Sequence, residues 1–131
     1  MTCPACVVAG ARATIGARFR AQGRDPALGL DCVGVVACAL RSAGCDAALP
    51  RDYRLRSAGV PSFAVPRALV AADGGQAGDI LLFRVSALQL HLAVRTETGV
   101  VHADASLRRV VERPGDPPWP VIAAWRLEGG N

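Results

Sequence analysis

One cysteine and two histidines are the residues of this chain best suited to nucleophilic chemistry. Cys32 lies in the run Gly-Leu-Asp-Cys-Val-Gly-Val-Val, where a polar segment changes into an apolar one. The two histidines, His91 and His102, follow far downstream in strand-like segments. A thiol with a distant imidazole as its base is the arrangement of cysteine hydrolases, whereas a cysteine alone is more often a small buried residue. The downstream residues must therefore decide between the two interpretations.

The residues after Cys32 predict the helix that would position it. The segment 32–44 is almost wholly apolar, Asp31 can cap its start, and Gly44 can end it. A thiol in the first turn of a helix meets unpaired N–H groups and the positive end of the helix dipole. From the sequence we therefore expect the thiolate of Cys32 to be favoured.

The two histidines are expected to meet on one face of a hairpin. The residues between them predict two strands that turn around Glu97 and Thr98. In an antiparallel pair with an even-numbered loop, residues at an odd separation face the same side of the sheet. His91 and His102 should therefore be neighbours, although either could instead be an ordinary core residue.

The remaining pattern predicts an α+β domain in which N-terminal helices pack on an antiparallel sheet of five to six strands. We interpret residues 1–131 as a single domain. Residues 17–31 are expected to form a polar loop and 46–78 an irregular region. The predicted helices cover residues 4–16, 32–44 and, within the irregular region, a short segment 66–72; the predicted strands cover 80–85, 90–95, 99–103, 108–113 and 121–127.

Charge and cysteine content limit the kinds of partner and cofactor that this chain is expected to bind. The formal charge is +4, with no dense basic run between aromatic residues, so nucleic-acid binding is not expected. The five cysteines are an odd number, which argues against a complete disulfide framework. Cys3 and Cys6 form a lone Cys-x-x-Cys without a second ligand pair, so no metal or other cofactor is expected. We interpret these two residues as part of a turn that opens the first helix.

The sequence contains neither a signal peptide nor an apolar stretch long enough to cross a bilayer. The expectation is synthesis in the cytoplasm without a leader and no membrane insertion.

Four strings, taken in order, resemble the NlpC/P60 cysteine peptidases, in particular the short phage-type cell-wall peptidases. They are Leu-Asp-Cys-Val-Gly at 30–34, Gly-Asp-Ile-Leu-Leu-Phe at 78–83, His-Leu-Ala-Val at 91–94 and Val-His-Ala at 101–103. The segment 15–24 also resembles the phage-type entry to the catalytic cysteine. None of the strings is specific alone, but the ordered set covers roughly residues 5–113.

The resemblance implies a papain-like α+β fold and hydrolysis of an amide in peptidoglycan stem peptides, typically the bond that joins D-γ-glutamyl to diaminopimelate or lysine. It places Cys32 at the nucleophile, His91 at the general base and His102 at the position that orients the base. Asp31 matches an acidic residue that grips the free amine of the substrate. The partners would be a stem peptide and phage tail or tail-like particle proteins, with action in the cell wall or periplasm.

One departure from the family pattern bears on activity. Phe19 falls where the family commonly has a tyrosine that lines the active site, and removal of such an oxyanion donor typically costs on the order of 10²- to 10³-fold in rate. The main alternative is therefore a catalytically degenerate structural module of a tail tip. A further alternative is acyl transfer by the same cysteine and histidine.

Overall fold

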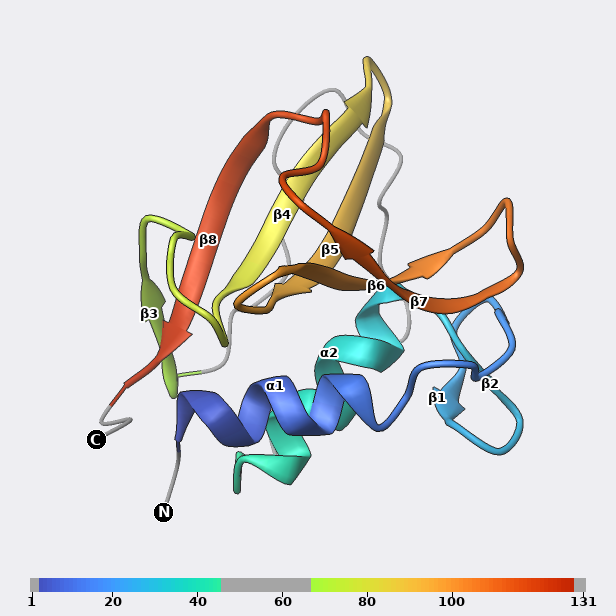
Figure 1. The fold of residues 1–131 in the computed structure, drawn as a ribbon, viewed down its shortest axis with the longest axis horizontal. Helices are drawn as coiled ribbons and strands as arrows, with labels where there is room; N and C mark the ends of the chain where they lie inside the picture. Colours follow the sequence, from blue (N-terminus) through green and yellow to red (C-terminus); the bar gives the residue numbers. More distant parts are fainter. Residues whose placement is uncertain (1–2, 46–66, 129–131) are drawn as a thin grey trace.

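Two helices packed against a six-stranded antiparallel sheet form the core of the molecule, as Figure 1 shows. The computed structural model describes residues 3–45 and 67–128. The sheet order is β3-β8-β4-β5-β6-β7. The strands are β3 (Leu69–Ala71), β4 (Ile80–Ser86), β5 (Gln89–Arg95), β6 (Gly99–Asp104), β7 (Arg109–Pro114) and β8 (Val121–Leu127). The α+β prediction and the predicted strand positions from residue 80 onward are confirmed, with bounds that differ by at most one residue.

Helix α2 (Cys32–Ser42) is the central element of the core. The Asp31 carboxylate accepts a hydrogen bond from the Gly34 N–H, so the predicted N-cap is confirmed. Eight of the eleven helix residues are buried, because α2 lies between helix α1 and strands β5 and β6. This position explains why the helix sequence is apolar on nearly every side.

Helix α1 (Pro4–Arg12) is shorter than the predicted segment 4–16. The Thr14 hydroxyl donates to the Ala11 carbonyl at 2.6 Å, which ends the helix locally. The Gly16 N–H then donates to the Val110 carbonyl of β7. The chain leaves the helix early because it joins the edge of the sheet.

The two helices approach each other closely at Gly10. A side chain at this position would place its Cβ 2.5 Å from the Cβ of Ser42 and 3.1 Å from the Cα of Ala39. Only a residue without a side chain fits between the helices here.

Two short elements differ from the prediction. Strands β1 (Arg24–Asp25) and β2 (Gly29–Leu30) form a small hairpin inside the expected loop 17–31. The predicted helix 66–72 is wrong, because Leu69–Ala71 is strand β3 and pairs with β8. A three-residue strand has too little periodicity to be recognised without its partner. Of the irregular region expected over 46–78, residues 46–66 lie outside the described part of the chain.

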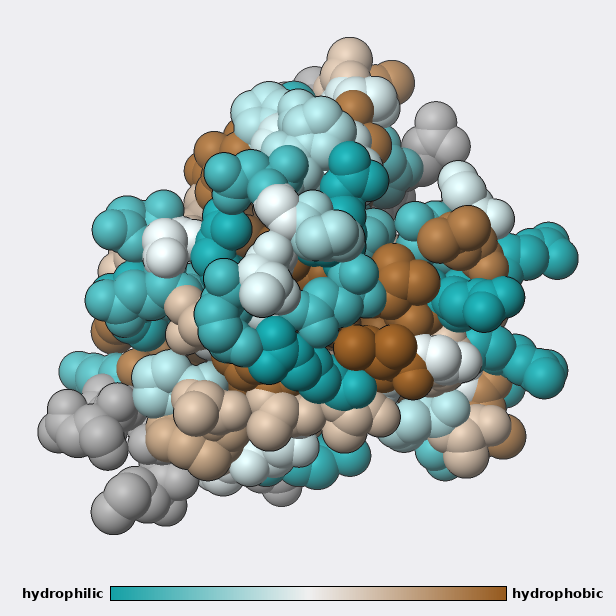
Figure 2. All heavy atoms as spheres, viewed as in Figure 1, coloured by the Kyte–Doolittle hydropathy of each residue, from teal (hydrophilic) through white to brown (hydrophobic). Residues whose placement is uncertain are grey.

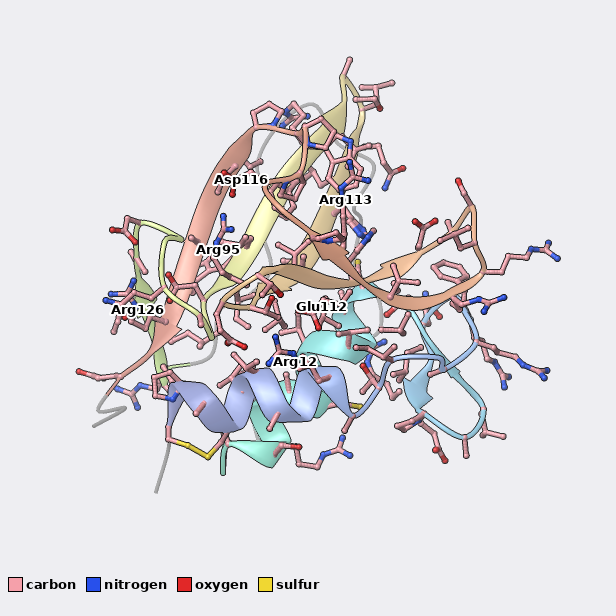
Figure 3. The ribbon with its side chains drawn as sticks, in the orientation of Figure 1. Arg12, Arg95, Glu112, Arg113, Asp116 and Arg126 are labelled. Atoms are coloured by element: carbon pink, nitrogen blue, oxygen red, sulfur yellow. A yellow bond between two sulfur atoms is a disulfide. The ribbon has the colours of Figure 1, made fainter. Side chains whose placement is uncertain are left out.

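Two ion-pair clusters join distant parts of the chain. Arg126 of β8 donates from Nε to Asp79 at 2.8 Å, and Asp79 is completely buried. Figure 3 shows Arg12 of α1 directed toward Glu112 of β7, where Nε and Nη2 donate to the two carboxylate oxygens at 3.0 Å each. The buried Asp79 carboxylate therefore has a structural role.

In the described residues, neither helix is long and apolar enough to traverse a bilayer.

Candidate active site

A pocket of about 550 Å³ brings together the residues that the sequence singles out. Its wall includes the predicted site residues Phe19, Asp31, Cys32, His91 and His102. They come from the segment before β1, the start of α2, and strands β5 and β6. The fold therefore assembles one hollow from four separate segments.

The two imidazoles are in direct contact. His91 Nε2 and His102 Nδ1 are 2.9 Å apart, and the ring planes are nearly perpendicular, at 82°. The pairing of Val94 with Val101 fixes the register of β5 and β6 and places both histidines on one face. The predicted proximity of the histidines is confirmed, while their catalytic roles stay predictions.

The contact also constrains the protons of the two rings. One proton lies between His91 Nε2 and His102 Nδ1, since a neutral imidazole has one donor and one acceptor nitrogen. If His91 Nε2 donates, His91 Nδ1 carries a lone pair and can accept a proton from a thiol. This is the tautomer that a base oriented by His102 requires.

The Cys32 thiol lies at the first residue of α2 and is only 4% exposed. Burial raises the pKa of Cys32 to about 12, and the neighbouring Asp31 carboxylate also raises it. Backbone hydrogen bonds from Leu92, Val33 and Cys32 itself act in the opposite direction. The sulfur therefore lies near Leu92 of β5, the residue after His91, and Cys32 and His91 line the same pocket.

This pKa corrects one expectation from the sequence. The helix start predicts a favoured thiolate, whereas burial outweighs the N–H groups and keeps Cys32 protonated. Burial and the neighbouring His102 lower the pKa of His91 to about 4. Burial also lowers the pKa of His102, against the raising effect of Asp104. The pair at rest is therefore a neutral thiol and a neutral imidazole.

Asp31 is 7% exposed, and both of its carboxylate oxygens accept hydrogen bonds from within the protein. Its Oδ1 accepts from the Gly34 N–H at 2.9 Å and from Arg24 Nη1 at 3.1 Å, and its Oδ2 accepts from the Gln22 N–H at 2.8 Å. These bonds tie the segment before β1 to the start of α2. They supply a structural reason for an acidic residue before Cys32, beside the predicted role in binding an amine.

Phe19 is a half-buried wall residue of the pocket. Its backbone is fixed on both sides, since the N–H donates to Arg108 and the residue bridges to Leu30. The phenyl ring offers no hydrogen-bond donor, in agreement with the departure noted in the sequence.

Trp119, between β7 and β8, is the pocket residue that the sequence reasoning missed. Its ring centroid lies 5.9 Å from each of the two imidazole centroids and 5.7 Å from that of Phe83. The Arg113 guanidinium lies 5.8 Å from the same ring. A tryptophan in a Pro-rich loop gives no signal in the sequence of a contact with histidines 17 and 28 positions earlier. In the structure it covers the histidine pair and contributes to its desolvation.

Asp104 also lines the pocket. Its Oδ1 accepts from the backbone N–H groups of Ser106 and Leu107, so it shapes the turn after β6. Its charge raises the pKa of both histidines. The carboxylate therefore acts on the imidazoles through space.

Cys3 and Cys6 form a disulfide across the first turn of α1, visible as a yellow bond in Figure 3. The expected helix-opening turn is present, and the disulfide is an addition to it. In the described part of the chain, no group of three or more histidine, cysteine or acidic side chains is placed to hold a metal ion.

The arrangement is suited to acyl chemistry: a thiol at a helix start, an imidazole that lines the same pocket, and a second imidazole in contact with the first. The backbone N–H groups around Cys32 can stabilise an oxyanion at this helix terminus.

Comparison with solved structures identifies the fold. The chain is similar to the crystal structure of the NlpC/p60 domain of the peptidoglycan hydrolase SagA, with a TM-score of 0.55 and 25% sequence identity. The similarity covers 85% of this chain and 88% of that chain. No protein-family model matches the sequence, and no curated protein matches it. The α+β fold and the resemblance to the NlpC/P60 family are confirmed by this structural match.

Proposed function

The chain has the fold of an NlpC/P60 peptidase domain, and on that premise we propose that it is a cysteine peptidase that cleaves peptidoglycan. The observation that carries the proposal is the convergence of Cys32, His91 and His102 on one pocket. The peptidoglycan hydrolase with a similar fold supports the substrate class.

The first half of the reaction forms a thioester. His91 Nδ1 takes the proton of the Cys32 thiol as the sulfur attacks the amide carbonyl carbon. Helix-terminal N–H groups stabilise the negative charge that develops on the carbonyl oxygen. The C–N bond then breaks, and the imidazolium of His91 gives its proton to the leaving amine.

The second half regenerates the thiol. His91, again neutral, takes a proton from a water molecule that attacks the thioester carbonyl. The C–S bond breaks, the acid product leaves, and Cys32 recovers its proton from His91. His102 holds the His91 ring throughout by the contact of 2.9 Å between Nε2 and Nδ1.

The proposed bond is the amide between a D-γ-glutamyl residue and diaminopimelate in the stem peptide. This specificity follows from the family resemblance. The phage-type strings further suggest a component of a phage tail or tail-like particle that opens the cell wall locally, with residues 1–131 acting as one catalytic domain.

The test is release of new free amines from purified peptidoglycan. Wild-type protein should release them, and Cys32→Ala should reduce the release to background. Cys38→Ala is the matched control, because Cys38 is a second buried thiol on the same helix, outside the pocket wall. Equal release by the wild type and Cys32→Ala would refute the proposal.

A structural module of a tail tip is the second candidate, favoured by Phe19 and by the burial of Cys32. Iodoacetamide labelling at pH 6, read for each cysteine by mass spectrometry, separates the two. A functional site should label Cys32 faster than Cys38 and Cys45, because the neutral His91 can take the thiol proton as the sulfur attacks the reagent, and His91→Asn should remove the difference. Slow labelling of all three thiols would favour the structural module.

A further inference from the structure

The Cys3–Cys6 disulfide has no part in the proposed hydrolysis. Neither residue lines the candidate active-site pocket, and the bond closes a ring across one helical turn, at a sequence separation of 3. In the chain-entropy account, a disulfide stabilises a fold by restraining the unfolded chain, and this effect is smallest for the shortest loops. The short ring therefore favours a chemical role for the two sulfurs over a stabilising one.

The first turn of α1 is held by contacts that do not involve the S–S bond. Pro4 occupies the start of the helix, where its fixed φ angle suits helical geometry. The Cys3 carbonyl accepts from the Cys6 and Val7 N–H groups at 3.1 and 3.3 Å. Pro4 also packs against Gly78, where an added Cβ would lie 2.8 Å from the Pro4 carbonyl oxygen. The helix start can therefore stay folded when the disulfide is reduced.

The two sulfurs have different surroundings. Cys3 is the N-cap residue, and its Sγ accepts a hydrogen bond from the Cys6 N–H at 3.1 Å. The first turn of α1 contains no acidic residue, so the N–H groups and the positive end of the helix dipole favour a thiolate at Cys3 after reduction. The Cys6 side chain instead packs against the hydrophobic core. Cys3 is thus the sulfur whose thiolate the fold stabilises.

This turn is also the place where solvent meets a cysteine sulfur. Cys3 and Cys6 are half-buried, whereas Cys32, Cys38 and Cys45 are buried free thiols. Figure 2 shows the outer side of α1 at the surface, as a band of pale, weakly hydrophobic atoms. A thiol in solution therefore reaches the disulfide more readily than it reaches the other three cysteines.

We propose that Cys3 and Cys6 form an exchangeable redox pair that reacts with small thiols in solution, separately from the proposed hydrolysis. A thiolate attacks the Cys3 sulfur, the S–S bond breaks, and Cys6 leaves as a thiolate. A second thiolate attacks the outer sulfur of the mixed disulfide, and Cys3 leaves as a thiolate. Two electrons pass to the protein, each cysteine takes up one of the protons that the small thiols lose, and the small thiols are oxidised to one disulfide.

The first experiment equilibrates the full-length protein with mixtures of reduced and oxidised glutathione. Alkylation followed by mass spectrometry reads each cysteine, and circular dichroism reports the helix content. The reduced fraction of Cys3 and Cys6 should rise as the mixture becomes more reducing, with the helix content unchanged. A bond that stays closed in reduced glutathione alone, or that opens only in denaturant, would overturn the proposal.

A matched pair of variants tests which sulfur exchanges. Cys6→Ser leaves Cys3 beside its N–H donor, while Cys3→Ser leaves Cys6 against the core and keeps a good N-cap residue. With oxidised glutathione, the mixed disulfide should form about three- to tenfold faster at Cys3 of the first variant than at Cys6 of the second. Equal rates, or faster reaction of Cys6, would overturn the assignment of Cys3.

Cys45→Ser is the control for the wild-type experiment, because it removes a buried free thiol and keeps the Cys3–Cys6 pair. It should leave the reduced fraction at each glutathione mixture unchanged. A changed fraction would show that a buried thiol takes part in the exchange, and would overturn the proposal that Cys3 and Cys6 act as a pair on their own.

Discussion

Burial sets the protonation of the residues at the candidate site. Cys32 sits at a helix start, which the sequence predicts, yet its pKa lies near 12 because distant segments cover it. The Asp31 cap depends on neighbours along the chain and could therefore be predicted. Strand β5 packs near Cys32, and Trp119 packs on the two histidines. Both contacts depend on tertiary packing, which the local sequence does not predict.

The low pKa of His91 predicts the acid limb of activity. The proposed role of His91 as a base requires the neutral imidazole, and with a pKa of about 4 His91 is neutral at every pH well above that value. Hydrolysis should therefore show a plateau from about pH 5 upward, with kcat/KM falling as the pH drops through about 4. The measurement is kcat/KM against pH on a soluble stem peptide.

Trp119→Ala provides the comparison for this profile. Removal of the indole exposes both imidazoles to water, which raises the pKa of His91 toward 6.5. The acid limb should move to higher pH by about one unit or more. An unchanged limb in this variant would show that Trp119 does not desolvate the histidines.

At the scale of elements, the hairpin between His91 and His102 was predictable because strand parity is a local rule. Thr96 alone separates the expected turn residues, Glu97 and Thr98, from the expected strands, so the register of the hairpin had little freedom. The β1–β2 hairpin and β3 were missed because two- and three-residue strands are defined by their partners. The sequence thus predicts the strands that carry the histidines better than it predicts β1, β2 and β3.

The contact between α1 and α2 gives a prediction of stability. Alanine normally favours a helix over glycine, but a Cβ at position 10 would lie 2.5 Å from the Cβ of Ser42. Gly10→Ala should therefore destabilise the protein, by about 1–3 kcal/mol. Chemical denaturation gives the free energy of unfolding.

A second substitution tests whether this clash is the cause. Ser42→Gly removes the opposing Cβ, so the double variant Gly10→Ala/Ser42→Gly should be more stable than the sum of the two single effects predicts. Additive effects would show that the destabilisation by Gly10→Ala does not come from the contact with the Cβ of Ser42.

At the scale of the whole molecule, acid acts on two separate regions. His91 is held neutral in the folded state, with a pKa near 4 against an ordinary value of 6.5. Glu112, bonded to Arg12, Thr96 and Thr98, has its pKa lowered from 4.5 to about 2. In both cases the unfolded chain binds the proton more readily, so the free energy of unfolding decreases as the pH falls.

The two groups act in different pH ranges. His91 should lower the stability as the pH falls from about 6.5 to 4, and Glu112 should lower it further from about 4.5 to 2. Glu112→Gln should reduce the pH dependence of the free energy of unfolding only in the second range. At neutral pH it should lower that free energy by about 1–2 kcal/mol, because charge-assisted hydrogen bonds are lost. Denaturation at a series of pH values tests this, and an unaltered slope below pH 4.5 in the variant would contradict it.

The disulfide between Cys3 and Cys6 affects how the cysteines of this protein would respond to oxidants. The two half-buried sulfurs of the chain are joined to each other within one helical turn, while Cys32, Cys38 and Cys45 are buried free thiols. Oxidants thus meet a linkage that is already closed, and the three free thiols are buried. Cys32, the proposed nucleophile, should therefore stay reduced under conditions in which unpaired surface cysteines would cross-link.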